Sequence, residues 1–311
     1  MRIIFVGMLG YFSGPPLKMV SMTGAEVTAV IVPAPAGPHG DGPRRLEPPA
    51  SSPFDLPVLN APVEQNILAL AWERQIPAWR VSTLKGESLS LLVHLRPDLI
   101  VVACCPYRFP QTLLDLPKYG CLNLHPSLLP AYRGPEPLFW QARHDAREAG
   151  VTLHFLDAGL DSGDIVAQTR FERPDGLGGA ALEQQCAEAG AALLATAVAQ
   201  LQAGKPLPRR PQIEQQASYY PLPGPADFII PPTWPARRAF NFLRGAESWP
   251  LRIDLGPVSF EIRQAKSYSD RQSLDRPYRL LGDDLWVQFQ PGVLHAKINP
   301  QSKCPDPGPF G

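Results

Sequence analysis

The stretch Leu122–Gly134 reads LNLHPSLLPAYRG and holds the two most informative polar side chains of the chain. Asn123 and His125 are separated by one leucine, and because side chains alternate along a strand, both should lie on one face of an extended segment. Pro126 cannot donate to a sheet ladder, so the strand should end at His125. Open α/β sheets bind their ligands at the carboxyl ends of strands. The stretch therefore predicts an amide and an imidazole side by side at such an end.

A carboxylate follows at a fixed separation. The run Gly150–Asp164 reads GVTLHFLDAGLDSGD and places Asp161 after the next predicted strand. An amide, an imidazole and a carboxylate together can supply an oxyanion donor and a proton carrier. Asp157 and Asp164 lie in the same run, and aspartates in tight loops often bond turn amides instead.

Both runs resemble the folate-dependent formyltransferases, a family that includes methionyl-tRNA formyltransferase, glycinamide ribonucleotide formyltransferase and sugar N-formyltransferases. The family signature is N-x-H, then S-L-L-P, then a carboxylate in an L-D-x-G turn. Asn123, His125 and Asp161 occupy these positions, so the resemblance implies that they are the catalytic residues. It covers about residues 1–205 well and the rest more loosely.

The resemblance implies transfer of the formyl group of N10-formyltetrahydrofolate to an amine. Asn123 would donate to the oxyanion, His125 would carry a proton, and Asp161 would hold the imidazole. In relatives, the loop after the Asp98–Cys105 strand and the loop before the aspartate bind the folate. The folate-binding residues implied here are Cys105, Tyr107, Arg108, Phe109, Leu156 and Asp157. Core packing is the alternative role for the two aromatic residues.

The acceptor is less clearly specified. Ser127 and Arg133 follow the catalytic strand, and the guanidinium can bind a phosphate or carboxylate by its planar fork, or it can be solvated. The Pro33–Pro62 loop, which is rich in basic residues in methionyl-tRNA formyltransferases, has only Arg44 and Arg45 here. Few positive charges predict weak tRNA binding. The expected acceptor is either a small amine (an amino sugar or amino acid derivative) or charged initiator methionyl-tRNA. Five arginines could form a basic surface for the latter, namely Arg209, Arg210, Arg237, Arg238 and Arg244.

Two other functions use the same residues. A formyltetrahydrofolate hydrolase would share the Asn/His/Asp site and differ in what reaches the formyl carbon. A non-catalytic folate-binding relative is the second alternative, and the presence of all three polar residues disfavours it.

The order of the remaining elements predicts the fold class. Strands alternating with helices up to the helix at Leu182–Leu201 indicate a doubly wound, mostly parallel α/β sheet. Short strands separated by turns after Arg252 indicate a small, β-rich C-terminal domain. We expect a formyltransferase-like catalytic domain over 1–204, a linker over 205–225, an open-barrel-like domain over 226–298 and a proline-rich tail over 299–311.

Composition limits the remaining possibilities. With 44% hydrophobic and 19% charged residues and a net charge of zero, the chain is typical of globular proteins. No apolar run reaches transmembrane length, and Ile3–Val6 is too short for the apolar region of a signal peptide, so we expect a cytoplasmic enzyme without membrane partners. Five irregularly spaced cysteines and scattered histidines predict neither a disulfide framework nor a metal site. The sequence does not indicate an oligomeric state.

Overall fold

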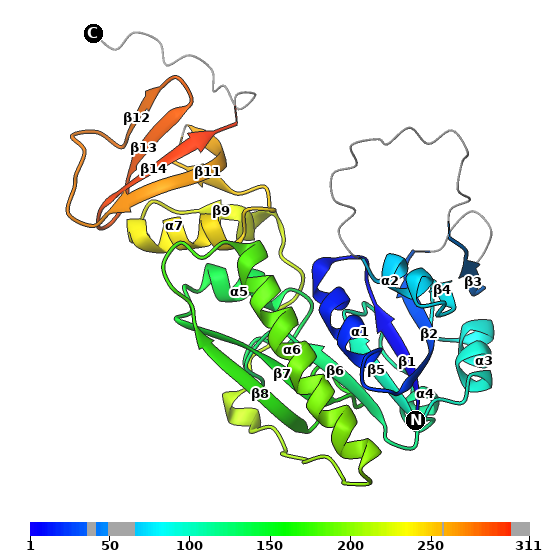
Figure 1. The fold of residues 1–311 in the computed structure, drawn as a ribbon. Coiled ribbons are helices and arrows are strands. Elements are labelled where there is room, and N and C mark those ends of the chain that lie inside the picture. Colours follow the sequence, from blue (N-terminus) through cyan, green and yellow to red (C-terminus); the bar gives the residue numbers. More distant parts are fainter. Residues whose placement is uncertain (36–41, 49–65, 257, 300–311) are drawn as a thin grey trace, which may run out of the picture. The chain divides into compact units, whose positions relative to one another are not determined.

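The computed structural model describes residues 1–35, 42–48, 66–256 and 258–299 (Figure 1). Grouping by α-carbon proximity divides the chain into two compact units. The first unit comprises Met1–Gly134, Gly150–Arg170 and Glu183–Tyr219. The second unit comprises Pro135–Ala149, Phe171–Leu182 and Tyr220–Gly311. The domain boundaries expected at residues 204 and 226 stay a prediction, and the expected tail lies, except for Asn299, outside the described residues.

An eight-stranded sheet frames the first unit, in the order β3-β4-β2-β1-β5-β6-β7-β8. The pairs β4–β2, β2–β1, β1–β5 and β5–β6 are parallel, while β3 runs antiparallel to β4 and β7 antiparallel to β6. The expected mostly parallel sheet is therefore confirmed. The strands are β1 (Arg2–Gly7), β2 (Glu26–Pro33), β3 (Arg44–Leu46), β4 (Ala78–Val81), β5 (Leu99–Ala103), β6 (Cys121–His125), β7 (Glu148–Phe155) and β8 (Ile165–Glu172).

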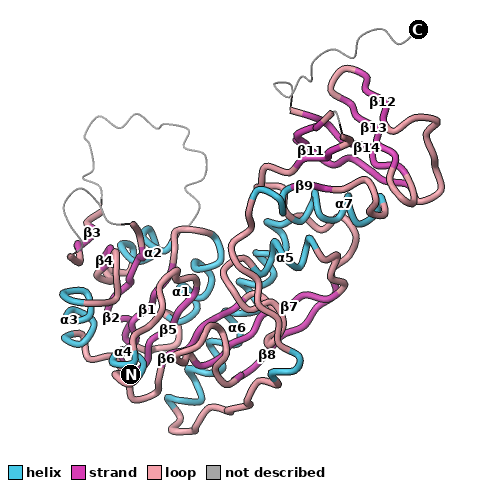
Figure 2. Tube along the Cα trace, turned by 180° about the vertical axis from the view of Figure 1, so that it is seen from behind, coloured by secondary structure: helices cyan, strands magenta, loops and turns pink. Residues whose placement is uncertain are grey.

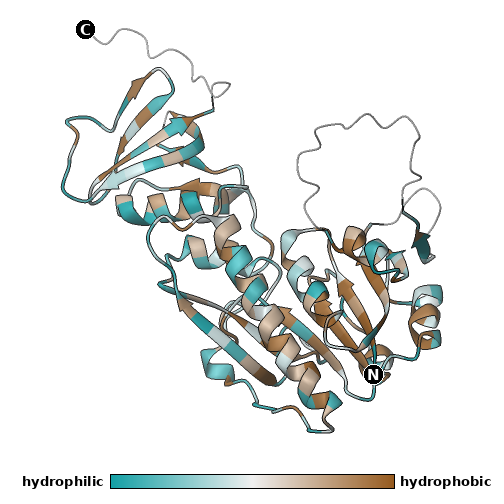
Figure 3. Ribbon diagram, in the orientation of Figure 1, coloured by the Kyte–Doolittle hydropathy of each residue, from teal (hydrophilic) through white to brown (hydrophobic). Residues whose placement is uncertain are grey.

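The central strands are apolar because helices cover both faces of the sheet (Figures 2 and 3). One face carries a buried cluster that includes Val6, Val102 and Cys121 together with Leu92 and Leu113 from two covering helices. On the other face α6 (Gly179–Gln202) approaches so closely that a Cβ at Gly190 would lie 3.3 Å from the Leu124 side chain. Asn123 and Leu124 thus belong to opposite faces, as alternation requires.

The remaining helices are short. In the first unit they are α1 (Gly14–Val20), α2 (Ile67–Glu73), α3 (Gly86–His94), α4 (Gln111–Leu114) and 3-10 turns at Tyr11–Ser13 and Glu214–Gln216. In the second unit they are α5 (Pro137–Arg143), α7 (Ala236–Gly245) and a 3-10 turn at Pro225–Phe228. Asn66 caps α2 because its side-chain oxygen accepts from the backbone N–H groups of Leu68 and Ala69. None of the helices in the described part of the chain is long and apolar enough to cross a membrane.

A six-stranded sheet forms the centre of the second unit, in the order β12-β13-β14-β11-β10-β9. Its strands are β9 (Ile229–Ile230), β10 (Arg252–Asp254), β11 (Ser259–Ser269), β12 (Tyr278–Leu281), β13 (Asp284–Gln288) and β14 (Val293–Ile298). All pairs except β9–β10 are antiparallel. Helix α7 packs on β11 and β14. The expected small β-rich region is confirmed.

One expectation about local structure is wrong. The Pro33–Pro62 segment is expected to be a loop, but Arg44–Leu46 within it forms β3 and pairs antiparallel with β4. The Trp72 indole N–H donates to the Leu46 carbonyl and helps to hold this edge strand. Three residues are too few to show an alternating pattern, so this strand depends on its neighbour. Most of the rest of the segment lies outside the described residues.

Candidate active site

The carboxyl end of β6 carries the predicted amide and imidazole. The register pairs Val6 with Val102 and Val102 with Asn123, so Asn123 shares the face of the buried cluster. His125 ends the strand on the same face, two residues further on. The predicted side-by-side placement is thus what the backbone shows.

His125 is almost fully buried and has a defined tautomer. Its Nε2 lies 2.8 Å from the carbonyl oxygen of Tyr132, and because a carbonyl only accepts, Nε2 must carry the hydrogen. Nδ1 then faces the Asp161 carboxylate, with Oδ2 at 3.8 Å. In the neutral imidazole, Nδ1 is therefore the nitrogen that can take up a proton.

Asp161 is held on the loop between β7 and β8. Its backbone adopts φ +52°, in the left-handed region. Its Oδ2 accepts from the Gly134 N–H at 2.9 Å, and its carbonyl oxygen accepts from the Gln212 side-chain amide at 2.7 Å. Contacts from two other loops thus hold the carboxylate beside the imidazole, and it is the one acid of the three candidates that reaches His125.

A second histidine, His154 on β7, lies directly opposite Asn123 in the antiparallel register. Its Nδ1 lies 2.8 Å from the Phe155 carbonyl and must donate, so neutral Nε2 accepts the Asn123 amide N–H at 3.0 Å. Burial is the main influence on His154 and lowers its pKa to about 4, against the opposing attraction of Asp161. This neutral imidazole fixes which way the Asn123 amide points.

The sequence alone does not single out His154, because it stands in the largely apolar run Val151–Phe155. The signal that identifies it is its register. On the neighbouring antiparallel strand, the residues that pair with Asn123 and His125 must also be two positions apart. Here Asn123 pairs with His154, and His125 pairs with Thr152.

The residues expected to bind folate divide into two groups. Cys105, Tyr107, Phe109 and Leu156 all pack against the buried cluster on the face that Asn123 shares. Burial raises the pKa of the Cys105 thiol to about 11, so this thiol stays protonated. Arg108 is exposed. Asp157 is exposed too, and it accepts from the Gly159 N–H and the Ser162 hydroxyl, as the turn-bonding alternative expects. Folate contacts by these residues stay a prediction.

Ser127 and Arg133 both have partners within the chain. The Ser127 hydroxyl is fully buried and donates to the Ala131 carbonyl at 2.7 Å. The Arg133 guanidinium donates to the Glu214 carboxylate through two nitrogens, at 2.7 and 3.1 Å. It also donates to the Gln212 side-chain oxygen. Gln212 donates in turn to the Asp161 carbonyl. Arg133 therefore helps, through Gln212, to hold the Asp161 loop in position. Acceptor binding by Ser127 and Arg133 stays a prediction.

We expect Gly163→Ala to destabilise this loop. A Cβ at Gly163 would clash with the Phe155 carbonyl oxygen, a backbone atom that cannot move without shifting the strand that carries it. Overpacking of this kind costs about 1–3 kcal/mol of unfolding free energy. Urea denaturation measures the loss, and Gly224→Ala, where the nearest atom is 3.9 Å away, is the matched control. Equal stability of both variants would contradict this crowding at Gly163.

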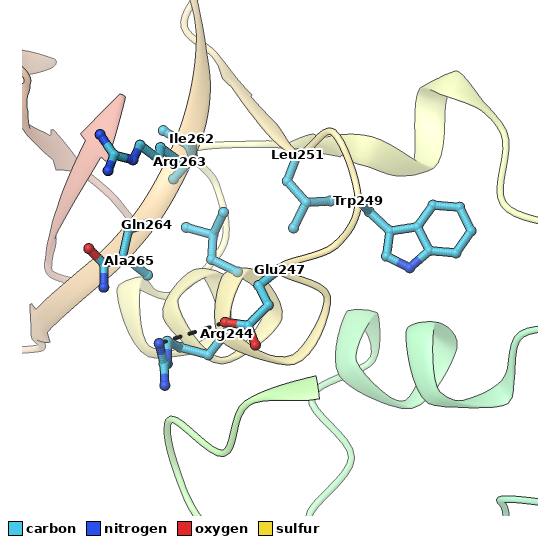
Figure 4. Close-up of a pocket in the computed structure, with 9 residues that line it drawn as sticks. Arg244, Glu247, Trp249, Leu251, Ile262, Arg263, Gln264 and Ala265 are labelled. Atoms are coloured by element: carbon cyan, nitrogen blue, oxygen red, sulfur yellow. Dashed lines mark ion pairs between the residues drawn. The ribbon is translucent and has the colours of Figure 1, made fainter. Parts of the chain in front are cut away.

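Two further features of the described residues bear on ligands. They contain no group of three or more His, Cys, Asp or Glu side chains that could hold a metal ion. In the second unit, a pocket of about 370 Å³ is lined by the end of α7, the segment that follows it and β11 (Figure 4). Arg244 and Glu247 form an ion pair in it at 3.8 Å. None of the predicted catalytic residues lines this pocket.

Comparison with known proteins places this site in a family. A family model described as formyl transferase matches residues 25–198. The methionyl-tRNA formyltransferase of Acetivibrio thermocellus is 34% identical over 251 residues, covering 81% of this chain and 75% of that protein.

Solved structures share the fold at low sequence identity. The N-formyltransferase of Helicobacter canadensis, solved with folinic acid and dTDP-3-aminofucose, aligns over 96% of this chain and 99% of its own, with a TM-score of 0.66 and 15% identity. HypX from Aquifex aeolicus, solved with tetrahydrofolic acid, aligns over 95% of this chain and 43% of its own, with a TM-score of 0.62 and 16% identity. Sequence and fold agree that this chain belongs to the formyl transferase family and is a formyltransferase.

Proposed function

We propose that this protein transfers the formyl group of N10-formyltetrahydrofolate to a primary amine, with Asn123, His125 and Asp161 as its catalytic residues. One observation carries the proposal. The Nδ1 of His125 faces the Asp161 carboxylate at 3.8 Å, beside an Asn123 amide whose direction is fixed by His154. The Helicobacter canadensis and Aquifex aeolicus structures, which contain folate compounds, support the choice of donor.

Each side chain has a distinct task. The folate supplies an activated one-carbon acyl group. Asn123 donates one amide hydrogen to His154. Its second amide hydrogen can stabilise the negative charge that develops on the formyl oxygen when the amine attacks. His125 can take up the proton that the amine loses and return it to the departing folate nitrogen. Asp161 stabilises the imidazolium between these two steps.

The apolar surface beside these groups suits a flat ring system. Tyr107, Phe109 and Leu156 are partly buried against the cluster that Asn123 borders. Small-ligand sites are mostly apolar with a few fixed polar groups, and this arrangement has both. The aromatic residues thus fit a pteridine ring as well as they fit the core.

The test of the activity is turnover with defined substrates. The purified protein is incubated with N10-formyltetrahydrofolate and a panel of amines, and tetrahydrofolate formation is followed together with the mass of the formylated amine. Amine-dependent turnover is expected. Release of formate without any amine would instead identify the hydrolase, and folate binding without turnover would identify the binding protein.

We further propose that the acceptor is a small amine rather than tRNA. Arg44 and Arg45 are the only basic residues of the Pro33–Pro62 segment, and Arg45 is paired with Glu47 at 3.0 Å. Two of the five arginines that could have served tRNA are also engaged. Arg237 bridges Asp145 and Asp175, and Arg238 stacks on Trp234 at 3.8 Å. A guanidinium group that already has a partner within the protein neutralises a phosphate less effectively. Its binding therefore releases few counterions from the nucleic acid.

We therefore expect weak binding of charged initiator tRNA with a shallow dependence on salt. Each phosphate contact adds about 0.9 to the slope of log K against log salt for duplex nucleic acid, so a surface with few available cations gives a small slope. Filter binding across a salt series measures it. Tight binding with a steep slope would return the acceptor to methionyl-tRNA, the substrate named for the Acetivibrio thermocellus relative.

A further inference from the structure

We propose that Gln212 is a positioning residue for formyl transfer, because it lies on a segment, residues 210–219, that joins the two loops beside the catalytic groups. The segment falls within the linker expected over 205–225, but it belongs to the first unit, as both loops do. The inference rests on the proposed formyl transfer. It adds a residue that acts through the Asp161 carboxylate rather than on the substrate.

The first loop that the segment holds is the one after β6. The Ser218 hydroxyl accepts from the Tyr132 N–H at 2.9 Å. The Ser218 carbonyl accepts from the Arg133 N–H at 2.8 Å, and the Ser218 N–H donates to the Pro130 carbonyl at 3.2 Å. The Tyr132 carbonyl is the acceptor that keeps the hydrogen of His125 on Nε2. The segment thus holds the backbone that sets the tautomer of the proposed proton carrier.

The second loop is the one that carries Asp161. The Gln212 side-chain amide donates to the Asp161 carbonyl at 2.7 Å and to the Gly163 carbonyl at 2.8 Å. Further along the same loop, Ile165 and Arg210 exchange two backbone hydrogen bonds, at 2.8 and 3.1 Å. The backbone of this loop is therefore bound to the segment at three successive places.

The direction of the Gln212 amide is determined by Arg133. The guanidinium Nε and Nη2 lie 3.1 and 2.8 Å from the Gln212 side-chain oxygen, and because a guanidinium only donates, the amide nitrogen must face the Asp161 loop. The nearly buried Arg133 side chain is held in turn by two hydrogen bonds to the Glu214 carboxylate. Hydrogen bonds between charged groups are among the stronger ones in proteins. Gln212 is thus a well-held link between the two loops.

The backbone of Asp161 needs such a link. Its φ of +52° lies in the left-handed region, which a residue other than glycine adopts only at an energetic cost. Its carboxylate lies 3.8 Å from both His125 Nδ1 and His154 Nε2, beyond the length of a hydrogen bond, so it acts on these rings through its charge. Without Gln212 the loop loses two hydrogen bonds, and relaxation of its backbone would displace the carboxylate from the imidazole.

The test separates the two ends of this link. Gln212→Leu removes the hydrogen bonds at both ends. Gln212→Glu keeps an acceptor for Arg133, but its carboxylate has no hydrogen to donate to the Asp161 loop. Both variants should lower kcat roughly 10–10²-fold, because misplacement of a catalytic group by about 1 Å can cost about 10²-fold. The folate dissociation constant and the KM for the acceptor should stay close to the wild-type values.

A second glutamine on the same segment provides the matched control. Gln215 is exposed, and Gln215→Leu and Gln215→Glu make the same chemical changes there, so both should keep the wild-type kcat. Rates are measured on the full chain with N10-formyltetrahydrofolate and the fastest of three acceptors, which are leucinamide, a dTDP-amino sugar and charged initiator methionyl-tRNA. The melting temperature of every variant is recorded alongside.

A double variant shows through which group Gln212 acts. Gln212→Leu is combined with Asp161→Asn, which has no carboxylate charge to be positioned. Residues that act through one another have non-additive effects, so the double variant should keep a kcat within about threefold of that of Asp161→Asn alone. A residue that only stabilises the fold would lower kcat by the same factor in either background.

The outcomes separate this inference from the proposed function. Wild-type kcat in Gln212→Leu or Gln212→Glu overturns the inference, and so does a lower melting temperature with unchanged kcat. Losses that multiply in the double variant overturn it too, because Gln212 would then act independently of Asp161. If Gln212→Leu fails to fold, Gln212→Glu, which keeps the Arg133 contact, replaces it in both comparisons. If the wild type formylates none of the three acceptors, the proposed function fails, and this inference with it.

Discussion

Replacing His125 by Gln is expected to lower kcat by roughly 10²–10⁴-fold, the range that general acid–base catalysis contributes. A glutamine amide can still donate to the Tyr132 carbonyl, which His125 Nε2 does at 2.8 Å, so the loop after β6 keeps this contact. It cannot take up a proton as Nδ1 does beside Asp161. The loss should therefore fall on turnover, with folate binding and melting temperature close to those of the wild type.

The control for this variant is another histidine. His94 is exposed at the end of α3, and His94→Gln should have wild-type kinetics. The measurement is steady-state formation of tetrahydrofolate with saturating folate and acceptor, together with folate binding by fluorescence. Near-wild-type kcat in His125→Gln would remove His125 from the reaction and leave the proposed chemistry without its proton carrier.

Local rules explain why strand β6 could be predicted. The alternation in Leu122–His125 determines which side chains share a face, and Pro126 determines where pairing ends. Both are properties of neighbouring residues, and the structure follows them closely. The three-residue strand β3 was missed for the opposite reason, since Arg44–Leu46 is extended only because β4 offers a partner.

The position of the Asp161 carboxylate, by contrast, does not follow from the residues next to it in the sequence. The position of Asp161 beside His125 depends on a left-handed backbone, on the Gly134 N–H and on Gln212, which lies 51 residues further along the chain. Neither contact has a sequence pattern of its own, so the spacing of the family motif was the only guide. Arg133 was expected to be either an acceptor contact or a solvated side chain, and its bonds to Glu214 and Gln212 are equally long-range.

Asp161→Asn should lower kcat by roughly 10²-fold or more while leaving folate binding nearly unchanged. The substitution keeps the shape of the side chain, and its amide oxygen can still accept from the Gly134 N–H, as Oδ2 does at 2.9 Å. It removes the negative charge that lies 3.8 Å from His125 Nδ1 and would stabilise the imidazolium. That stabilisation operates only while His125 carries the extra proton, so its loss belongs to the reaction path and not to ground-state affinity.

Two neighbouring acids make this prediction specific. Asp157 bonds the turn through the Gly159 N–H and Ser162, and Asp164 faces Arg209 at 3.5 Å, so neither is expected to influence the imidazole. Asp157→Asn and Asp164→Asn should each keep kcat within a few-fold of the wild type. Single-turnover rates and folate dissociation constants for the three variants decide the matter. A normal rate with weakened folate affinity in Asp161→Asn would make the carboxylate a ligand contact, and a large rate loss in Asp157→Asn would transfer the catalytic role to the other acid.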